Sequence, residues 1–194
     1  GLSDGYFVLP YTIGNYLAGT KTAKLDANHP EFRAAEAGVH ELTDKLLSIK
    51  GKRTVASFHR ALGKLVWDYC GMSRNAEGLQ TAIEKIKSLR QDYWSGVLVA
   101  GAGEELNQSL EVAGRVADFF ELAELMCMDA LDRNESAGGH FREEFQTADG
   151  EALRDDEHYS YVSAWEYAGD NRAPVLHKEL LEFQYVHPSQ RSYK

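Results

Sequence analysis

Apolar side chains recur every three to four positions through most of residues 28–132, and this rhythm constrains the fold more than any other feature of the sequence. The rhythm stops at Gly51 and again at Gly71, and a polar capping residue, Thr54 or Asn75, precedes the next apolar stretch. Such breaks end one amphipathic helix and start another. Because short connections between long helices favour antiparallel neighbours, the sequence predicts a mainly α fold built on an antiparallel three- to four-helix bundle.

Four helices are expected in this region, each with one apolar stripe. The inward positions are Phe32, Val39, Leu42 and Leu46 in the first helix, Val55, Phe58 and Leu62 in the second, Leu79, Ile83, Ile86 and Tyr93 in the third, and Leu106, Leu110, Ala113, Phe120 and Leu131 in the fourth. The two cysteines, Cys70 and Cys127, fall inside these patterns. Their spacing supports neither a disulfide nor a metal pair, so we expect reduced, buried thiols.

Residues 2–17 carry apolar side chains on nearly all sides of a helix rather than along one stripe. Pro10 lies in the middle, where it removes a backbone donor and costs about 3 kcal/mol unless packing compensates. A helix that is apolar all round needs burial on several sides. We therefore interpret residues 1–27 as a helix and linker belonging to a larger preceding domain. In the isolated chain we expect residues 2–17 to self-associate or to be disordered.

The composition changes in residues 135–194, which hold five of the ten tyrosines and four of the seven histidines. Residues 158–167 and 175–186 alternate like strands, and the segment 168–174 between them has the composition of a turn. The sequence therefore predicts a helical bundle over residues 28–134, followed by a small antiparallel β element within a β and coil tail over residues 135–194.

Several segments have the composition of a binding site but lack its spacing. With 21 basic against 30 acidic residues, the net charge of −9 argues against nucleic acid or an anionic membrane as the partner. The segment GAGEEL (101–106) lacks the strand and further glycines or lysine of a phosphate-binding loop. The acidic run 148–158 lacks the ligand spacing of a calcium loop. Metal-ligand spacing is also missing at His59, His140, His158 and His177. We assign no catalytic, cofactor-binding or metal-binding residue.

A charged stretch, RNESAGGHFREEF, directly follows the last helix at residues 133–145. Gly138 can take the positive φ that ends a helix. We predict a strand over residues 139–145 that places His140, Arg142 and Glu144 on one face. Charges on a buried face need partners. The candidate partners are Arg133, Glu135, Arg154, Asp155 and Asp156. The stretch is therefore either a rim of surface ion pairs or a structural joint.

These residues resemble the carboxyl-terminal signature of the flavoprotein subunit of succinate dehydrogenase and fumarate reductase, a superfamily that also contains L-aspartate oxidase. In that family a string Arg-x-Glu-Ser-x-Gly-x-His-x-Arg closes the last helix, and Arg-Asp-Asp follows. The matching positions, which we take as a structural or interface motif, are Arg133, Glu135, Ser136, Gly138, His140, Arg142, Arg154, Asp155 and Asp156. Ala137 departs from the pattern, because related chains usually carry Cys or Arg there. Residues 175–179 and 190–194 resemble the family's final strand and ending.

The resemblance implies a parent enzyme that interconverts succinate and fumarate with FAD and passes electrons through an iron–sulfur subunit to membrane quinone. It implies that FAD binds upstream of this chain, which would be a carboxyl-terminal fragment without the active site or a cofactor of its own. The implied partners are the preceding FAD-binding and capping domains, the iron–sulfur subunit and, indirectly, a membrane anchor. The implied location is the cytoplasm, at the inner face of the cytoplasmic membrane, as part of a complex.

Two other interpretations stay open. The first is a stand-alone helical interaction module, although the all-round apolar helix at residues 2–17 argues against it because a free module would cover that surface. The second is the carboxyl-terminal region of L-aspartate oxidase, which shares the Arg-Glu-Ser-Gly-His core. The extended tail at residues 150–167, GEALRDDEHYSYVSAWEY, is more similar to the dehydrogenase branch.

Overall fold

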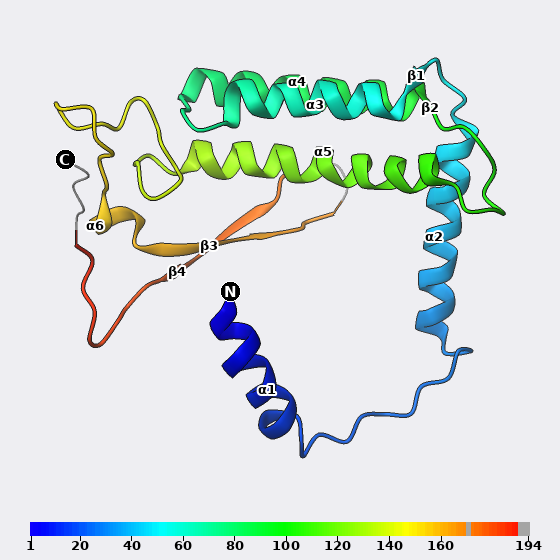
Figure 1. Ribbon diagram of the computed structural model, residues 1–194, viewed down its shortest axis with the longest axis horizontal. Helices are drawn as coiled ribbons and strands as arrows, with labels where there is room; N and C mark the ends of the chain where they lie inside the picture. The colour runs from blue at the N-terminus through cyan, green and yellow to red at the C-terminus, as the bar shows by residue number, and fades with distance from the viewer. Residues whose placement is uncertain (170–171, 190–194) are drawn as a thin grey trace. The chain divides into compact units, whose positions relative to one another are not determined.

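A computed structural model describes residues 1–169 and 172–189 of the chain. The chain divides into two compact units, residues 1–42 and 43–194. In chain order the elements are η1 (Asp4–Val8), α1 (Leu9–Tyr11), η2 (Thr12–Tyr16), α2 (Pro30–Ser48), β1 (Arg53–Thr54), α3 (Val55–Cys70), α4 (Ala76–Gly96), β2 (Val97–Leu98), α5 (Gln108–Asp132), α6 (Asp156–Tyr159), β3 (Tyr161–Glu166) and β4 (Val175–Leu180) (Figure 1).

The first unit begins with the helical segment predicted from its apolar pattern. Pro10 has no N–H to donate, and the turns on either side of α1, η1 and η2, are π-helical. None of the side chains in η1, α1 or η2 is buried. This segment therefore presents its apolar side chains on its own surface, from Leu2 to Leu17.

Helix α2 spans both units, and Leu46 in its last turns is its one buried residue. The expectation that Phe32, Val39 and Leu42 face the core is wrong, because all three side chains are exposed. Helical periodicity identifies an apolar face but not the surface that covers it. The contribution of α2 to the core is therefore limited to its carboxyl-terminal end, where Lys45 also lies 4.2 Å from the ring centre of Trp94.

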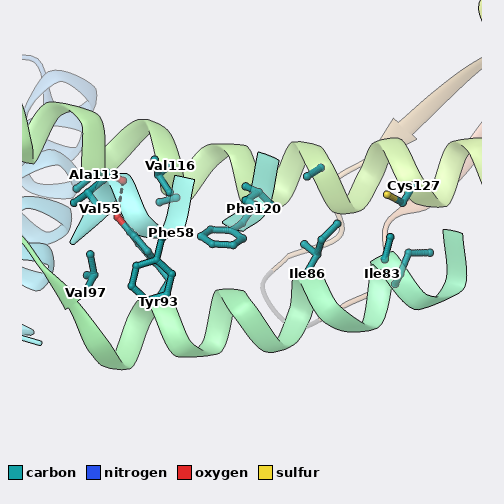
Figure 2. Close-up of a cluster of buried hydrophobic side chains, with 14 of the residues drawn as sticks. Val55, Phe58, Ile83, Ile86, Tyr93, Val97, Ala113, Val116, Phe120 and Cys127 are labelled. Carbon is teal, nitrogen blue, oxygen red and sulfur yellow. Dashed lines mark hydrogen bonds between the residues drawn. The ribbon is translucent and has the colours of Figure 1, made fainter. Parts of the chain in front are cut away.

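Helices α3, α4 and α5 lie side by side and enclose the core of the second unit (Figures 1 and 2). At its centre three aromatic rings meet: the ring of Tyr93 is 5.2 Å from that of Phe58 and 5.4 Å from that of Phe120, centre to centre. The Tyr93 hydroxyl donates to the carbonyl oxygen of Ala113 at 2.7 Å, so the buried polar atom has a partner. The predicted helical bundle is confirmed in these three helices.

The helix starts follow the capping residues in the sequence. The Thr54 side chain accepts a hydrogen bond from the Ser57 N–H, and the Asn75 side chain accepts one from the Gly78 N–H, as both positions predict. Asn107 caps α5, so that helix begins at Gln108. The inward position expected for Leu106 is therefore wrong: it precedes the cap and is fully exposed.

Strands β3 and β4 form an antiparallel hairpin that pairs Tyr161 with Leu180 and Glu166 with Val175. The Trp165 indole N–H donates to Asp129 of α5 at 2.8 Å, which fixes the hairpin against the bundle. The mainly α fold with a small antiparallel β element is thus confirmed, although His158, predicted in a strand, lies in α6. Part of the predicted turn at residues 168–174, and residues 190–194, lie outside the described residues.

Candidate functional site

The charged stretch reverses direction where α5 ends. Helix α5 stops at Asp132, and the backbones of Ala137 and His140 then exchange two hydrogen bonds of 2.9 and 3.0 Å. Gly138, between them, has φ +58°, a conformation that glycine adopts without strain. A second turn follows, in which the Phe145 N–H donates to the Arg142 carbonyl. The prediction of a continuous strand over residues 139–145 is therefore wrong, because two tight turns occupy that length.

Arg142 is folded back onto the end of α5 and is only 2% exposed. Its Nη1 donates to the carbonyl oxygens of Ala130 at 2.9 Å and Leu131 at 3.3 Å, which have no partner further along the helix. Its Nε donates to Glu144 at 3.1 Å. A buried cation at the negative end of a helix dipole, paired with a carboxylate, is favourable. Arg142 therefore caps α5 from the side.

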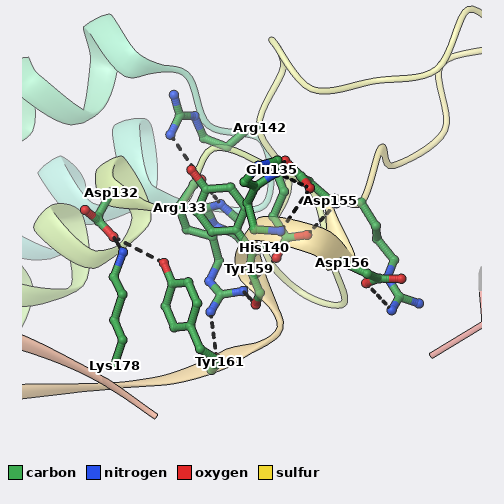
Figure 3. A network of polar contacts seen from close by, with 12 residues as sticks. Asp132, Arg133, Glu135, His140, Arg142, Asp155, Asp156, Tyr159, Tyr161 and Lys178 are labelled. Atoms are coloured by element: carbon green, nitrogen blue, oxygen red, sulfur yellow. Dashed lines mark hydrogen bonds and ion pairs between the residues drawn. The ribbon is translucent and has the colours of Figure 1, made fainter. Parts of the chain in front are cut away.

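Two buried polar side chains hold this turn in place. The Ser136 hydroxyl accepts from the Arg142 N–H at 2.8 Å and donates to the Arg142 carbonyl at 3.1 Å. Glu135, 3% exposed, pairs with Arg133 at 2.6 Å and accepts from the backbone N–H of Asp155 at 2.9 Å (Figure 3). Since each charge has a partner, the cost of burying the carboxylate is offset. Of the candidate partners Arg154, Asp155 and Asp156, only Asp155 thus contacts the stretch, through its backbone N–H.

His140 is held in one tautomer by its two partners. The Arg133 carbonyl can only accept, so Nε2 carries the proton and donates to it at 2.9 Å. Nδ1 is then the acceptor for Arg74 Nη1 at 3.1 Å. Burial is the main cause that lowers the pKa of His140, and the nearby charge of Arg74 lowers it further. The neutral His140 imidazole therefore links the Arg74 guanidinium to the Arg133 backbone carbonyl through two hydrogen bonds.

The stretch also binds the connection between α3 and α4. Arg74 forms an isolated parallel β-bridge with Arg142: the Arg74 N–H donates to the Phe141 carbonyl at 3.1 Å, and the Glu143 N–H donates to the Arg74 carbonyl at 2.8 Å. The Glu143 carboxylate accepts from Asn75 and Ser73, which lowers its pKa. Glu144 accepts from the Ala76 N–H at the first turn of α4. The stretch therefore joins the end of α5 to the start of α4.

We call these contacts the polar junction, made by Arg74, Arg133, Glu135, Ser136, His140, Arg142 and Glu144. The remaining motif residues lie beside it. Arg154 pairs with Asp156 and donates to the Ser189 carbonyl at 2.8 Å, on the surface. Asp155 caps α6 and pairs with His158, whose pKa it raises.

Arg74 is the member of the polar junction that the sequence did not indicate. It lies 66 positions before His140, and no local pattern distinguishes it from other arginines. Arg133 also reaches the carbonyl oxygens of Tyr159 and Tyr161, at 3.1 and 3.2 Å. The run of tyrosines was visible in the sequence, but it indicated strands rather than a guanidinium partner. Non-local contacts of this kind are fixed by the fold.

Three features of the described residues bear on chemistry beyond structural pairing. Among them, no group of three or more His, Cys, Asp or Glu side chains is arranged to hold a metal ion. The loop at residues 100–107 does not suit a dinucleotide, because the Asn107 side chain fills it by donating to the carbonyls of Ala100 and Ala102. A Cβ on Gly101 would meet that amide at 2.6 Å. Over the same residues, no helix has the length and apolarity to cross a bilayer.

Comparisons with known proteins agree with this architecture. The family described as "Fumarate reductase flavoprotein C-term" matches residues 59–193. An uncharacterised FAD-dependent oxidoreductase of Methanocaldococcus jannaschii is 33% identical over 68% of this chain, which spans 25% of that relative. An L-aspartate oxidase of Synechocystis is 33% identical over 42% of this chain and 17% of its own length.

The fold recurs in a solved structure of the E. coli quinol fumarate reductase flavoprotein, with a TM-score of 0.71 and 22% identity. The likeness covers 86% of this chain and 27% of that one. The relatives are several times longer, so this chain corresponds to a minor part of their length. The residues of the polar junction from Arg74 onward lie within the matched range. The chain therefore belongs to the fumarate reductase and succinate dehydrogenase flavoprotein family, and it represents that family's carboxyl-terminal region.

Proposed function

We propose that this chain is the structural carboxyl-terminal region of a flavoprotein subunit that interconverts succinate and fumarate. The observation that supports this role is that the residues of the polar junction, and the motif residues beside it, are engaged in helix capping, ion pairing, hydrogen bonding or turn formation. Arg142 caps α5, Glu144 caps α4, and His140 fills the space between two arginines. None of these three side chains lines either of two grooves among the described residues, one between α3 and α4 and one between α3 and α5.

The flavin chemistry then belongs to preceding domains of the same subunit. Residues 1–27 would be a helix and linker of the FAD-binding domain, residues 28–134 the brace for that domain, and residues 135–194 a tail near the iron–sulfur subunit. The exposed apolar side chains of η1, α1 and η2 support the first assignment, since a surface of this kind calls for a partner. Electrons would leave through the iron–sulfur subunit to quinone at the inner face of the cytoplasmic membrane.

The experiment is to purify the complete subunit with its partners and to assay both directions of the reaction. We expect bound FAD, succinate oxidation with an artificial electron acceptor, and fumarate reduction with a reduced dye. The same assay on the 194-residue chain alone should show neither flavin absorbance nor turnover. Stoichiometric flavin in the 194-residue chain would contradict the assignment of the cofactor to the preceding domains.

L-aspartate oxidase is the second candidate, because a relative of that name is 33% identical over 94 residues of the chain. The two candidates differ in the substrate of the parent enzyme. The discriminating measurement is acceptor reduction by the complete subunit with succinate or with L-aspartate as electron donor. Turnover with L-aspartate and none with succinate would replace the first candidate by the second.

A further inference from the structure

The β3–β4 hairpin has one face against the bundle and one face in solvent. On the inner face Tyr161 is buried, and the Trp165 indole donates to Asp129 of α5 at 2.8 Å. Lys178 pairs with Asp132, the last residue of α5, at 3.3 Å (Figure 3). Side chains alternate between the two faces of a strand. The outer face is therefore made by six exposed side chains: Val162, Ala164, Glu166, Val175, His177 and Glu179.

The backbone of β4 has an edge that faces away from β3. The Leu181 N–H donates to the Ser160 carbonyl at 3.0 Å, which fixes the alternation of the antiparallel ladder. This alternation directs outward the N–H and C=O groups of Leu176, Lys178 and Leu180. In the part of the chain that the structure describes, no hydrogen bond engages these outward groups. Unpaired groups in a row are a template for a further strand.

The other edge of the hairpin is less available. On β3 the Tyr161 carbonyl already accepts a hydrogen bond from Arg133 at 3.2 Å. Edge strands are often protected by an outward lysine, but the Lys178 side chain of β4 turns inward to Asp132. Of the two edges, that of β4 is therefore the one open to pairing.

The surface around this edge is acidic. Over the described part of residues 148–189 there are eight carboxylates and three basic side chains. Of the basic side chains, Lys178 is already paired with Asp132. Glu179 in β4 and Glu182 just after it have no ion-pair partner among the described residues. Two copies of such an edge repel one another, whereas a basic segment is attracted.

Apolar side chains accompany the charges. Val162 is 50% exposed and Val175 is 47% exposed, at opposite corners of the outer face. From the end of β4 onward, exposed apolar side chains continue at Leu180, Leu181, Phe183, Tyr185 and Val186. A strand that adds to this edge therefore gains apolar contacts as well as backbone hydrogen bonds.

We propose that β4 is the docking edge for an extended, basic segment of another protein chain, which adds to the hairpin as a third strand. The backbone of that segment pairs with the outward groups of β4, and its lysine or arginine side chains lie near Glu166 and Glu179. The proposal deepens the proposed function and rests on it in one respect, since that function puts residues 135–194 near another subunit.

The first test measures the binding of a fluorescein-labelled peptide of alternating lysine and valine to the 194-residue chain by fluorescence anisotropy. We expect saturable binding that weakens at high salt. The double substitution Glu166→Lys with Glu179→Lys should weaken it by about tenfold, because two attractions become repulsions. The matched control, Glu104→Lys with Glu105→Lys, makes the same charge change on the exposed loop before α5 and should alter binding by less than about twofold.

Two altered peptides separate strand addition from charge attraction alone. Methylation at every backbone nitrogen keeps the lysine charges but removes the N–H donors, and a peptide of alternating glutamate and valine reverses the charge. Neither should bind. Equal binding of the methylated peptide, or equal effects of the hairpin and loop substitutions, would overturn the proposal. It would also be overturned if the Leu180 N–H were protected from hydrogen exchange only at high chain concentration, because a second copy would then occupy the edge.

The second test places Glu166→Lys with Glu179→Lys in the complete subunit, purified together with its partners. We expect unchanged flavin content and unchanged turnover with an artificial electron acceptor, while the amount of co-purified partner falls several-fold at moderate salt. Unchanged recovery of the partner would contradict the docking edge. If the unsubstituted enzyme turned over neither succinate nor fumarate, the proposed function would fail, and the peptide measurements would still decide the role of β4.

Discussion

Single residues in the polar junction show how a charged motif becomes a structural element. Arg142 is buried because its guanidinium donates to carbonyl oxygens at the end of α5 that have no backbone N–H partner. The Ser136 hydroxyl fixes the Arg142 backbone by bonding both its N–H and its carbonyl. The pairing of Arg142 with Glu144 was not predicted, because the predicted partners of the stretch were Arg133, Glu135 and residues 154–156. Its capping of α5 was not predicted either, because that contact needs the turn at Gly138, and the sequence pattern there also fits a strand.

The first prediction concerns Arg142→Gln. The substitution leaves the Ala130 and Leu131 carbonyls without a charged donor, so the free energy of unfolding should fall by about 2–4 kcal/mol in urea denaturation. Arg115→Gln is the matched control, since Arg115 is an exposed arginine paired with Glu111 on the same helix. Its effect should stay below about 1 kcal/mol. If the two substitutions lowered the free energy of unfolding equally, the role of Arg142 as a buried cap of α5 would be contradicted.

The second prediction concerns pH. Folding lowers the pKa of His140 from 6.5, so the folded state disfavours the protonated imidazole. Its contribution to stability is complete above pH 6.5 and declines as the pH falls below that value toward the folded pKa. His140→Gln should therefore flatten the loss of stability on acidification, measured by thermal melts from neutral to mildly acidic pH.

His158 provides the opposite sign for the same experiment. Its pKa is raised by Asp155, so its contribution is complete below 6.5 and is lost as the pH rises through the folded pKa. His158→Gln should steepen the net loss on acidification rather than flatten it. If both substitutions change the pH profile in the same direction, the assignment of a neutral His140 is contradicted.

At the scale of elements, local signals located the helices, and long-range contacts decided what they cover. Thr54 and Asn75 cap the helices that their positions predicted, because a cap depends on the next three residues alone. The apolar stripe of α2 did not predict which of its residues are buried, since Phe32 and Val39 are exposed. Long-range contacts also decided the partners in the polar junction: Arg74 lies near His140 only in the folded bundle.

The third prediction tests the packing of the bundle with two adjacent phenylalanines of α5. Phe120 is fully buried against Tyr93, whereas Phe119 is partly exposed beside His59. Phe120→Ala should lower the free energy of unfolding by about 3–5 kcal/mol. Phe119→Ala should lower it by about 1 kcal/mol or less. If Phe119→Ala lowered the free energy of unfolding more than Phe120→Ala, the assignment of Phe120 to the core face of α5 would be contradicted.

At the scale of the whole molecule, the apolar segment at residues 2–17 contrasts with the satisfied polar groups of the second unit. Among the described residues, no buried side-chain nitrogen or oxygen lacks a hydrogen-bond partner. The segment 2–17, by comparison, buries none of its side chains within its own unit. An apolar surface of this size favours association.

The fourth prediction follows from that contrast. The 194-residue chain should form oligomers in light-scattering measurements, and the double substitution Phe7→Asp with Ile13→Asp should convert them to monomers. Asn15→Asp adds a charge at a polar position of the same segment and should leave the oligomers intact. A monomeric unsubstituted chain would contradict association through residues 2–17.

The central claim is that the polar junction stabilises the subunit and takes no part in its chemistry. The most direct test is His140→Ala in the complete enzyme, with turnover expressed per flavin in the assembled complex. We expect a lower yield or melting temperature of the complex, because Arg74 and the Arg133 carbonyl lose their shared partner, and a kcat within about twofold of the unmodified enzyme. Normal assembly combined with a loss of about a hundredfold in kcat would show His140 acting in catalysis and contradict the claim.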